Sequence, residues 1–595
     1  MAAKYDLVKE FKGYVTKPDV TNTDERYLSK GSFNVLVNEE EKVTGRKGYS
    51  LFGTANSDRN AIQSEFVWNT SGGTELLLRG ANNELQLYCE GEWITIASGF
   101  TTSQFGFPRS SKSGWWSNSL GLDVLPFVAK DSNIYKWNGA VEVVSATTSN
   151  TITLTNNATW AEARFDLTSG TVVINGTEYA YTGGTGTDTL TGVTPDPTGE
   201  ANGSVVTQKV ATESNKPGSG LTNDIIDILN NQLIVGDSSS REIYIGSNTS
   251  IVDFSTISTP REPGEAALLT LDNTPRAFVV QESTVYISAG TSDWYEVVFD
   301  LQSTSSGFIE NISVKKLKNA PQQACKEKDL VANIKNSVVF ISNEPTLEEL
   351  GRVENITTPQ SKPLSDPIKP DFDRYDFTGG DITYWKNQVF IAVPRESLVL
   401  VYDLNNGWWQ PPMNLPIAKF SVYQNKLIGH SKVQEESYEL FSDDQTSDNG
   451  NIINMQAVFA YRNFGDRALL KEFDEYYTEG YISGNTVLTL TLDYDFEGGT
   501  SQNTYKIFGN DNSITTRLST TGGLGSLPLG SSTLGSATEV PTELKKFRQV
   551  NGMRPTDFYE LRTIYSTTDD AAQFELIAHG PQIRYSPNQN NHITK

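Results

Sequence analysis

The chain has 595 residues, a formal net charge of −24 at pH 7 and only two cysteines, Cys89 and Cys325. This length allows several domains with large cores, and the acidic balance lacks the basic patches of a tight DNA or RNA binder. Two isolated cysteines exclude a disulfide framework and indicate synthesis in a reducing compartment. Abundant Tyr, Phe, Trp, Gly and Pro residues favour a β-rich, turn-rich protein.

Residues 1–70 are expected to form an extended arm with the first short strands. The opening sequence MAAKYDLVKEFKGY has no apolar core, so we expect no secretory signal. No run of the sequence approaches the length that crosses a bilayer. Asn-x-Ser/Thr sites such as Asn175 therefore carry no glycosylation meaning.

A hairpin pattern, made of an apolar run, a polar turn and a second apolar run, recurs seven times. From the third copy to the sixth, the turns fall roughly 52 residues apart. The gap between the second and third copies is about twice as long, which indicates an insertion. The turns lie at Asn82-Asn83, Asp131-Ser132, Asn230-Asn231, Glu282-Ser283, Lys335-Asn336 and Lys386-Asn387, and the seventh copy is 420–432.

A repeat of this length that consists only of short strands is typical of a β-propeller. The alternative is a series of unrelated hairpins in ordinary β-sandwiches, but the steady spacing favours the propeller. The WD, kelch and sialidase-type motifs are absent. We predict an all-β fold with a β-propeller of about seven blades, carried by residues 71–145 and 214–445. Its ring can close by borrowing a strand from the N-terminal arm or the C-terminal domain.

Residues 146–213 are rich in Thr and Gly and contain a strong hairpin signal at Asn175-Gly176. We interpret them as a small β-module inserted between the second and third blades, on the rim. The module either contacts a neighbouring subunit or fibre, or is a tolerated decoration. Trp115-Trp116, between the first two hairpins, is expected to pack between blades, with sugar stacking as the alternative.

The hairpin repeat ends before residues 446–595, where two alternating strand pairs at 473–496 and 558–585 predict a C-terminal β-sandwich. The Gly/Ser-rich stretch 520–539 is expected to be a flexible linker, with a mobile tip or a channel-facing element as alternatives. Residues 357–373 contain four prolines and predict a connector that cannot join a central strand.

The sequence offers no catalytic, cofactor-binding or metal-binding residue that we can nominate, and we expect no cofactor. His430, His579 and His592 lie in no zinc-binding motif. No nucleophile elbow, phosphate-binding loop or dinucleotide fingerprint is present.

One short acidic stretch resembles the start of a calcium loop. It contains Asp493, Asp495 and Glu497, but the twelfth position, where a bidentate Glu is needed, is Thr504. We therefore interpret these acids as the solvated face of a strand.

Two segments carry a family resemblance. NVLVNEEEKVTGRKGY (34–49) and YWKNQVFIAVPRESLVLVYDLNNGWW (384–409) are similar to elements of the tail nozzle group of short-tailed phages, also called tail tubular protein B. The group is related to packaged-DNA stabilization and tail hub proteins. The resemblance implies a structural virion protein that is not an enzyme, is made in the host cytoplasm and resides in the phage tail.

In that family the subunits form a ring, usually a homohexamer, below an adaptor or portal-proximal ring. The ring contacts tail fibres or tailspikes and the host envelope, and genomic DNA passes through it without sequence-specific binding. The charge of −24 suits such a conduit, because acidic walls do not hold a duplex through counterion release. The alternatives are a receptor- or carbohydrate-binding tail protein, which would use exposed Trp and Tyr, and a propeller glycan hydrolase.

Overall fold

A computed structural model describes most of the chain, and almost all of its regular structure is β-strand. The residues that it describes are 5–17, 24–56, 60–117, 121–131, 133–155, 164–166, 169–184, 187–213, 217, 224–255, 257–258, 260–281, 283–305, 307–317, 320, 323–335, 337–350, 363–464, 471–483, 486–494, 502–508, 545–552, 558–569 and 572–585.

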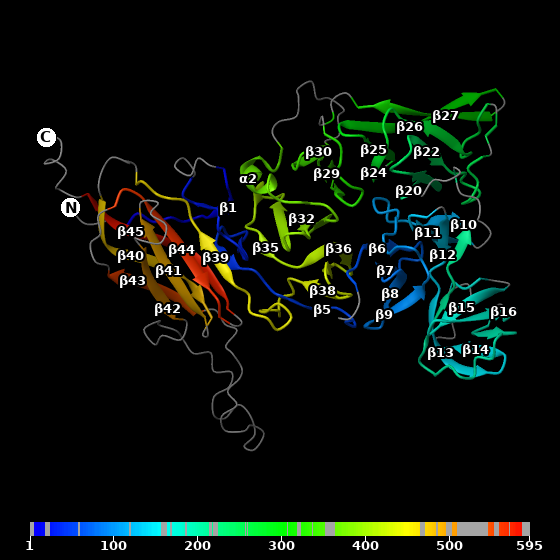
Figure 1. Cartoon of the computed structure of the whole chain (residues 1–595), viewed down its shortest axis with the longest axis horizontal. Coiled ribbons are helices and arrows are strands. Elements are labelled where there is room, and N and C mark those ends of the chain that lie inside the picture. Colours follow the sequence, from blue (N-terminus) through cyan, green and yellow to red (C-terminus); the bar gives the residue numbers. More distant parts are fainter. Residues whose placement is uncertain are drawn as a thin grey trace, which may run out of the picture.

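Seven small antiparallel sheets stand around one axis and form the blades of a β-propeller (Figure 1). The first four blades are β6 (Ser64–Asn69), β7 (Glu75–Ala81), β8 (Glu84–Cys89) and β9 (Glu92–Ala97); β10 (Trp115–Ser117), β11 (Leu122–Val128), β12 (Ile134–Trp137) and β19 (Ala211–Glu213); β20 (Ile225–Leu229), β21 (Gln232–Gly236), β22 (Glu242–Ile245) and β23 (Ala267–Thr270); and β24 (Pro275–Gln281), β25 (Thr284–Ala289), β26 (Asp293–Thr304) and β27 (Gly307–Lys316). The last three are β28 (Val331–Ile334), β29 (Ser337–Ile341) and β30 (Leu347–Leu350); β31 (Asp381–Trp385), β32 (Gln388–Val393), β33 (Leu398–Asp403) and β34 (Trp408–Trp409), with β35 (Met413–Asn414) also on β33; and β36 (Ile417–Tyr423), β37 (Lys426–Ser431) and β38 (Ser437–Leu440).

The ring closes with a strand from the N-terminal arm, one of the two sources expected. β5 (Tyr49–Leu51) pairs with β38 and supplies the fourth strand of the seventh blade. β1 (Lys12–Tyr14) and β2 (Tyr27–Leu28) extend the sixth blade beyond β34. The arm also sends β3 (Val35–Val37) and β4 (Val43–Gly45) into the C-terminal domain, so it joins three sheets.

The hairpin turns occur where the sequence places them, but in the first two blades the predicted turn joins a different pair of strands than in the later blades. Asn82-Asn83 and Asn230-Asn231 both have positive φ at each residue, as a two-residue hairpin turn requires. Asn230-Asn231 joins the first and second strands of its blade, whereas Asn82-Asn83 joins the second and third. The inner strand β6 ends in a different turn, at 70–74, and therefore lacks the repeated signal.

The inserted module lies within the second blade, so its predicted place between the second and third blades was wrong. After the module the chain returns as β19, which pairs with β12 and completes that blade. An insertion between outer strands leaves the inner packing of the propeller intact. The module has its own hydrophobic core and comprises β13 (Val141–Thr148), β14 (Thr151–Leu154), β15 (Gly170–Ile174), β16 (Thr177–Tyr181), β17 (Thr189–Thr191) and β18 (Val205–Gln208).

The C-terminal domain is a β-sandwich at the opposite end of the molecule from the inserted module (Figure 1). One sheet has the order β3-β4-β45-β40-β43 and the other β39-β44-β41-β42. The predicted linker 520–539 lies outside the described residues. The C-terminal strands are β39 (Met455–Val458), β40 (Lys471–Ile482), β41 (Val487–Tyr494), β42 (Gln502–Phe508), β43 (Lys545–Gly552), β44 (Leu561–Thr567) and β45 (Phe574–Tyr585).

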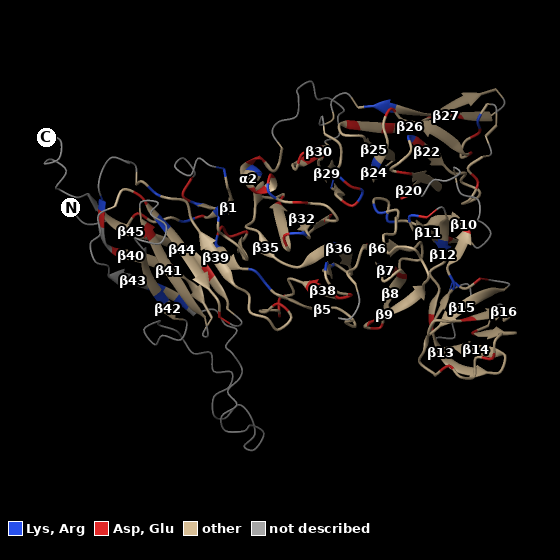
Figure 2. Ribbon diagram, viewed as in Figure 1, with Lys and Arg blue, Asp and Glu red and all other residues tan. Residues whose placement is uncertain are grey.

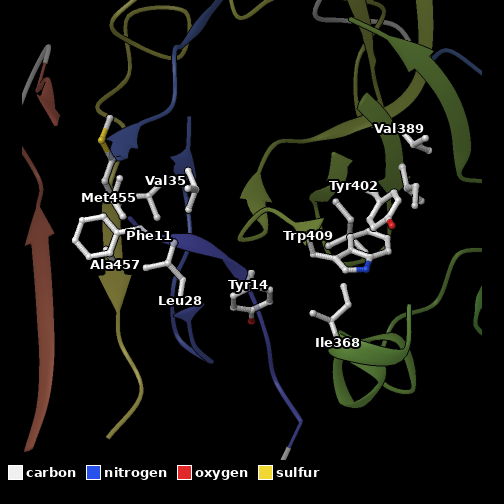
Figure 3. Packing of buried hydrophobic residues seen from close by; sticks show 14 of the residues in the cluster. Phe11, Tyr14, Leu28, Val35, Ile368, Val389, Tyr402, Trp409, Met455 and Ala457 are labelled. Atoms are coloured by element: carbon white, nitrogen blue, oxygen red, sulfur yellow. The ribbon is translucent and has the colours of Figure 1, made fainter. Parts of the chain in front are cut away.

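One continuous hydrophobic core joins the sandwich to the propeller. Figure 3 shows its middle part, where Phe11, Leu28 and Val35 of the arm lie between the sandwich and Trp409 of the sixth blade. The described end of the proline-rich connector forms η1 (Asp366–Ile368) and α2 (Lys369–Phe372), whose apolar side chains belong to the same core.

Candidate functional site

The inner strands converge on the propeller axis, which is occupied by a cluster of charged side chains centred on Arg109. Its guanidinium donates to Glu65 (2.8 Å), Asp381 (2.7 Å) and Asp329 (2.9 Å), which lie on or beside the inner strands of three blades. Lys419 donates to the second oxygen of Asp329 at 2.6 Å. We call these five residues the axial cluster.

Local backbone geometry places Arg109 on the axis. The second blade has no long inner strand: Gly106 pairs with the end of β11, and β10 pairs with its beginning. Between them the chain makes a turn, in which the N–H of Lys112 donates to the carbonyl of Pro108. This turn projects Arg109 toward the other blades. A regular inner strand would have kept this part of the backbone within its own sheet.

The electrostatics of the axial cluster follow from burial and from the cations that face each carboxylate. Burial raises the pKa of Glu65 to about 7, although Arg109 opposes that rise. Burial also raises the pKa of Asp381. Burial alone would raise the pKa of Asp329 too, but Lys419 and Arg109 hold it below its usual range. Three carboxylates thus lie beside Arg109, Lys419 and the neighbouring Lys328, and burial is the main reason why Glu65 binds a proton near neutral pH.

A hydrogen-bonded chain continues from the axial cluster across the seam between the seventh and first blades. Ser421 Oγ donates to Glu65 at 2.6 Å and lies 2.9 Å from His430 Nε2. On the other side, His430 Nδ1 lies 2.9 Å from Ser437 Oγ, which accepts from Arg79. Because Ser421 uses its one proton on Glu65, it accepts from His430, so the proton of neutral His430 sits on Nε2 and Ser437 donates to Nδ1.

The far end of this row of hydrogen bonds holds the seventh and first blades together. Arg79 Nη2 and Gln86 Nε2 both donate to Glu435, at 3.2 and 2.8 Å. Burial lowers the pKa of His430 to about 3, so the imidazole stays neutral. The seam is thus held by side chains from β7 and β8 on one side and from the β37–β38 region on the other.

The arrangement is suited to locking the propeller rather than to covalent catalysis. His430 is completely buried between two serines, and each of those hydroxyls is already engaged by a third group. A serine nucleophile would instead need an exposed hydroxyl and a His–carboxylate pair behind it. Among the described residues, no group of three or more His, Cys, Asp and Glu side chains could hold a metal ion.

A cavity of about 180 Å³ lies beside the axial cluster, lined by inner-strand residues such as Val67, Asn333 and Thr383. Arg109 borders it, and Lys328 closes an adjoining part by donating to the carbonyls of Phe105 and Asp224. A cavity of this size beside an ion cluster cannot pass a nucleic-acid duplex. No helix in the described part of the chain is long and apolar enough to span a membrane.

The residues singled out in the sequence have varied roles. Trp115 is buried and packs between the second and third blades, as predicted, whereas Trp116 is 43 % exposed. His579 is buried in the sandwich, 3.0 Å from the hydroxyl of Tyr476. His592 lies outside the described residues.

The interpretation of the acidic stretch at 493–497 as a solvated strand face was wrong for Asp493. That side chain is completely buried, accepts from Tyr461 at 2.8 Å and pairs with Arg562 of the neighbouring strand. Its partners come from distant segments, so local sequence does not announce them. Asp495 and Glu497 lie outside the described residues.

No protein-family model and no curated protein matches the chain. Solved structures with overall likeness include BamB from Moraxella catarrhalis, with 9 % identity, a TM-score of 0.30 and coverage of 75 % of this chain and 99 % of that one. BBS1N in complex with ARL6DN has 12 % identity, a TM-score of 0.36 and coverage of 67 % and 98 %. Streptogramin B lyase has 11 % identity, a TM-score of 0.25 and coverage of 66 % and 98 %. Likenesses this weak carry no functional argument.

Proposed function

We propose that the chain is a structural virion protein of a tailed bacteriophage, a tail nozzle or hub subunit. In this proposal, copies of the chain form a ring, a homohexamer, that closes the tail and opens for genome ejection. The observation that carries the proposal is the meeting of the two segments that bear the family resemblance. They are distant in sequence, yet both lie at the joint between propeller and sandwich.

The first segment, 34–49, is fixed at this joint by Arg46. The completely buried side chain of Arg46 donates to Asn34 at 2.9 Å and to Asp448 at 2.7 Å. Gly48 is required beside it, because a Cβ there would lie 1.9 Å from the carbonyl oxygen of Ser447. An Arg-x-Gly element therefore has a physical reason at this place.

The second segment, 384–409, continues into direct contact with the first. The N–H of Val37 donates to Gln410, whose amide returns a hydrogen bond to the carbonyl of Val37, at 2.8 and 2.9 Å. Trp409 pairs with Tyr14 of the arm and donates its indole N–H to the carbonyl of Leu364. The result is a stiff joint, which suits a subunit that transmits force along a virion tail.

The closed propeller axis supports a particular form of the conduit. Because the axial cluster blocks each propeller, the DNA path would run between subunits, along the axis of the ring. Walls from a chain of net charge −24 would let genomic DNA slide without sequence-specific binding. The proposed partners are an adaptor or portal-proximal ring above, tail fibres or tailspikes at the side, and the host envelope at the distal end. The protein would be made in the host cytoplasm and reside in the virion.

A structural role is favoured over an enzymatic one by the polar clusters themselves. The polar groups of the axial cluster and the seam hydrogen-bond to one another, so few of them remain to bind a substrate. A conduit subunit needs no reactive group. We therefore do not propose an enzyme.

A receptor- or carbohydrate-binding role is the second candidate, and exposed Trp116 favours it. The backbone of Trp116 is fixed by the side chain of Asn231, which accepts from its N–H at 2.5 Å and donates to its carbonyl at 3.1 Å. A polar hollow lined by Ser111, Ser113 and Asn230 lies nearby. An exposed aromatic ring on a fixed stretch of backbone, beside polar groups, is a suitable platform for a sugar.

Negative-stain electron microscopy of the purified protein, alone and with its adaptor ring, tests the two candidates. The conduit predicts closed rings with a central opening and no saturable binding to host glycans. Monomers that persist with the adaptor present, together with glycan binding that Trp116→Ala abolishes, would favour the second candidate and refute the first.

A further inference from the structure

The two outer strands of the fourth blade are the longest in the propeller. β26 has 12 residues and β27 has 10, and the hairpin they form extends past the rim, on the side away from the sandwich (Figure 1). The outer half of β26, from Asp300 onward, is exposed. At about 3.4 Å per residue, this hairpin reaches well beyond the blade.

One face of the hairpin carries apolar side chains from its root to its tip, interrupted by Glu310 and Ser303. Cross-strand pairs Val297–Val314 and Phe299–Ile312 pack against the third blade. The next positions on the same face are Leu301, opposite Glu310, and Phe308, opposite Ser303. Leu301 is 56 % exposed and Phe308 is 59 % exposed. The apolar face of the blade core therefore continues into solvent.

The exposed residues Leu301 and Phe308 belong to a hairpin that the third blade holds in place. Arg261, from the loop before β23, donates to the Glu310 carboxylate at 2.6 Å and accepts the Glu310 backbone N–H at 3.1 Å. The Gly264 N–H donates to the same carboxylate. These bonds mark the end of the cover that the third blade provides, and Leu301 and Phe308 lie on the outer side of it.

The outer edge of β27 is open for pairing beyond that point, as far as the described residues show. The Glu310 N–H points away from β26, so the backbone groups of Phe308, two residues along, point the same way. An exposed strand edge that carries apolar side chains is a site where another polypeptide chain associates. The free groups and the apolar side chains lie at the same place on the tip.

The charge distribution favours a second copy of this chain as the occupant. Residues 301–309 read LQSTSSGFI and carry no charge, although the whole chain has a net charge of −24. In Figure 2 the far end of β26 is tan, whereas charged residues mark the root of the hairpin. Two acidic subunits repel each other least where their contact is uncharged and apolar.

We propose that the tip of the β26–β27 hairpin, with Leu301 and Phe308 as its anchors, docks on the neighbouring copy in the ring. This inference rests on the proposed ring assembly and names one contact that builds it. In a homohexameric ring this contact is heterologous, with the tip of one copy on a different surface of the next, and its repetition closes the ring because the rotation between neighbours divides the full circle.

The test compares Leu301→Ser/Phe308→Ser with the wild type in ring assembly, measured by mass photometry over a range of concentrations. Leu268→Ser is the matched control, because Leu268 is 49 % exposed on the adjacent β23. We expect the control to assemble like the wild type and the double variant to need at least about tenfold more protein. Rings from the double variant at the wild-type concentration would overturn the inference and leave the proposed function standing. Failure of the wild type itself to assemble, with or without the adaptor, would remove both.

A second measurement covers the case in which the double variant folds poorly. A photo-crosslinking amino acid replaces Phe308 alone, and the assembled wild-type-like ring is irradiated. Cross-links between copies are expected. Cross-links confined to one copy, or found only with lipid vesicles or host glycan, would overturn the inference.

Discussion

Replacement of Arg109 by Met tests whether the axial cluster holds the propeller together. The change removes three hydrogen bonds of 2.7–2.9 Å and leaves Glu65 and Asp381, which are 7 % and 0 % exposed, with Lys419 as the remaining cation of the cluster. Removing one partner from a buried ion pair costs about 3–5 kcal/mol. Because Arg109 borders the cavity, we expect the lower end, about 3 kcal/mol at pH 8.

The pH dependence of this loss is the sharper part of the prediction. The pKa of Glu65 and that of Asp381 are already raised by burial, and without Arg109 both rise further. At pH 5.5 these carboxyls take up protons and no longer need a cation, so we expect the loss to fall to about half. Urea unfolding of the propeller, followed at pH 5.5 and pH 8, measures both values.

A matched control separates this effect from a general loss of charge. Lys426→Met breaks a pair with Glu439 in which the Lys side chain is 50 % exposed, and such a pair contributes no more than about 1 kcal/mol. If Arg109→Met cost as little as Lys426→Met, or cost the same at both pH values, the reasoning about the axial cluster would be refuted.

Three further variants test other parts of the structure. The raised pKa of Glu65 makes the wild type lose stability as the pH rises from the ordinary carboxyl range toward 7, whereas the amide in Glu65→Gln does not titrate. The melting temperature of the variant minus that of the wild type should therefore increase from pH 5 to pH 8. A difference that stays constant with pH would contradict this account. Arg46→Met leaves Asp448 without its buried partner and should lower the stability of the propeller–sandwich joint by about 3 kcal/mol. Limited proteolysis should then separate the two domains of the variant faster than those of the wild type. Equal cleavage rates would argue against a stiff joint. Gly48→Ala should destabilise the same joint by more than about 1 kcal/mol, because the obstructing Ser447 carbonyl is backbone. Gly199→Ala is the control, because its Cβ would meet open space and its φ, like that of Gly48, is not left-handed; similar melting curves for the two variants would show that close approach is not the cause.

The parts of the fold that local sequence specifies were predictable. Two-residue turns such as Asn230-Asn231 and Lys386-Asn387 need positive φ, which Asn tolerates, so each hairpin can be recognised from the residues of its turn. The inserted module and the sandwich were visible for the same reason, through alternating strands and a change in composition. The phase of the repeat was not visible in the first blade, because the turn after β6 lacks that dipeptide.

The candidate site depends on contacts between distant segments, and these left little trace in the sequence. Arg109 reaches the axis through a turn that replaces an inner strand, and its carboxylate partners come from three other blades. One signal was available: Asp329 and Asp381 each stand at or just before the inner strand of their blade, at nearly the same distance from the hairpin turn that follows. The buried environment of Asp493 has no such signal, because its partners Tyr461, beyond the end of β39, and Arg562, on β44, are distant from it in sequence.

A three-dimensional reconstruction of the ring assembled with its adaptor tests the central claim most directly. The account predicts a closed ring in which the lumen lies between subunits and each propeller axis is filled at Arg109. Particles that remain monomeric with the adaptor present, or DNA density that passes through the propeller axes themselves, would contradict it.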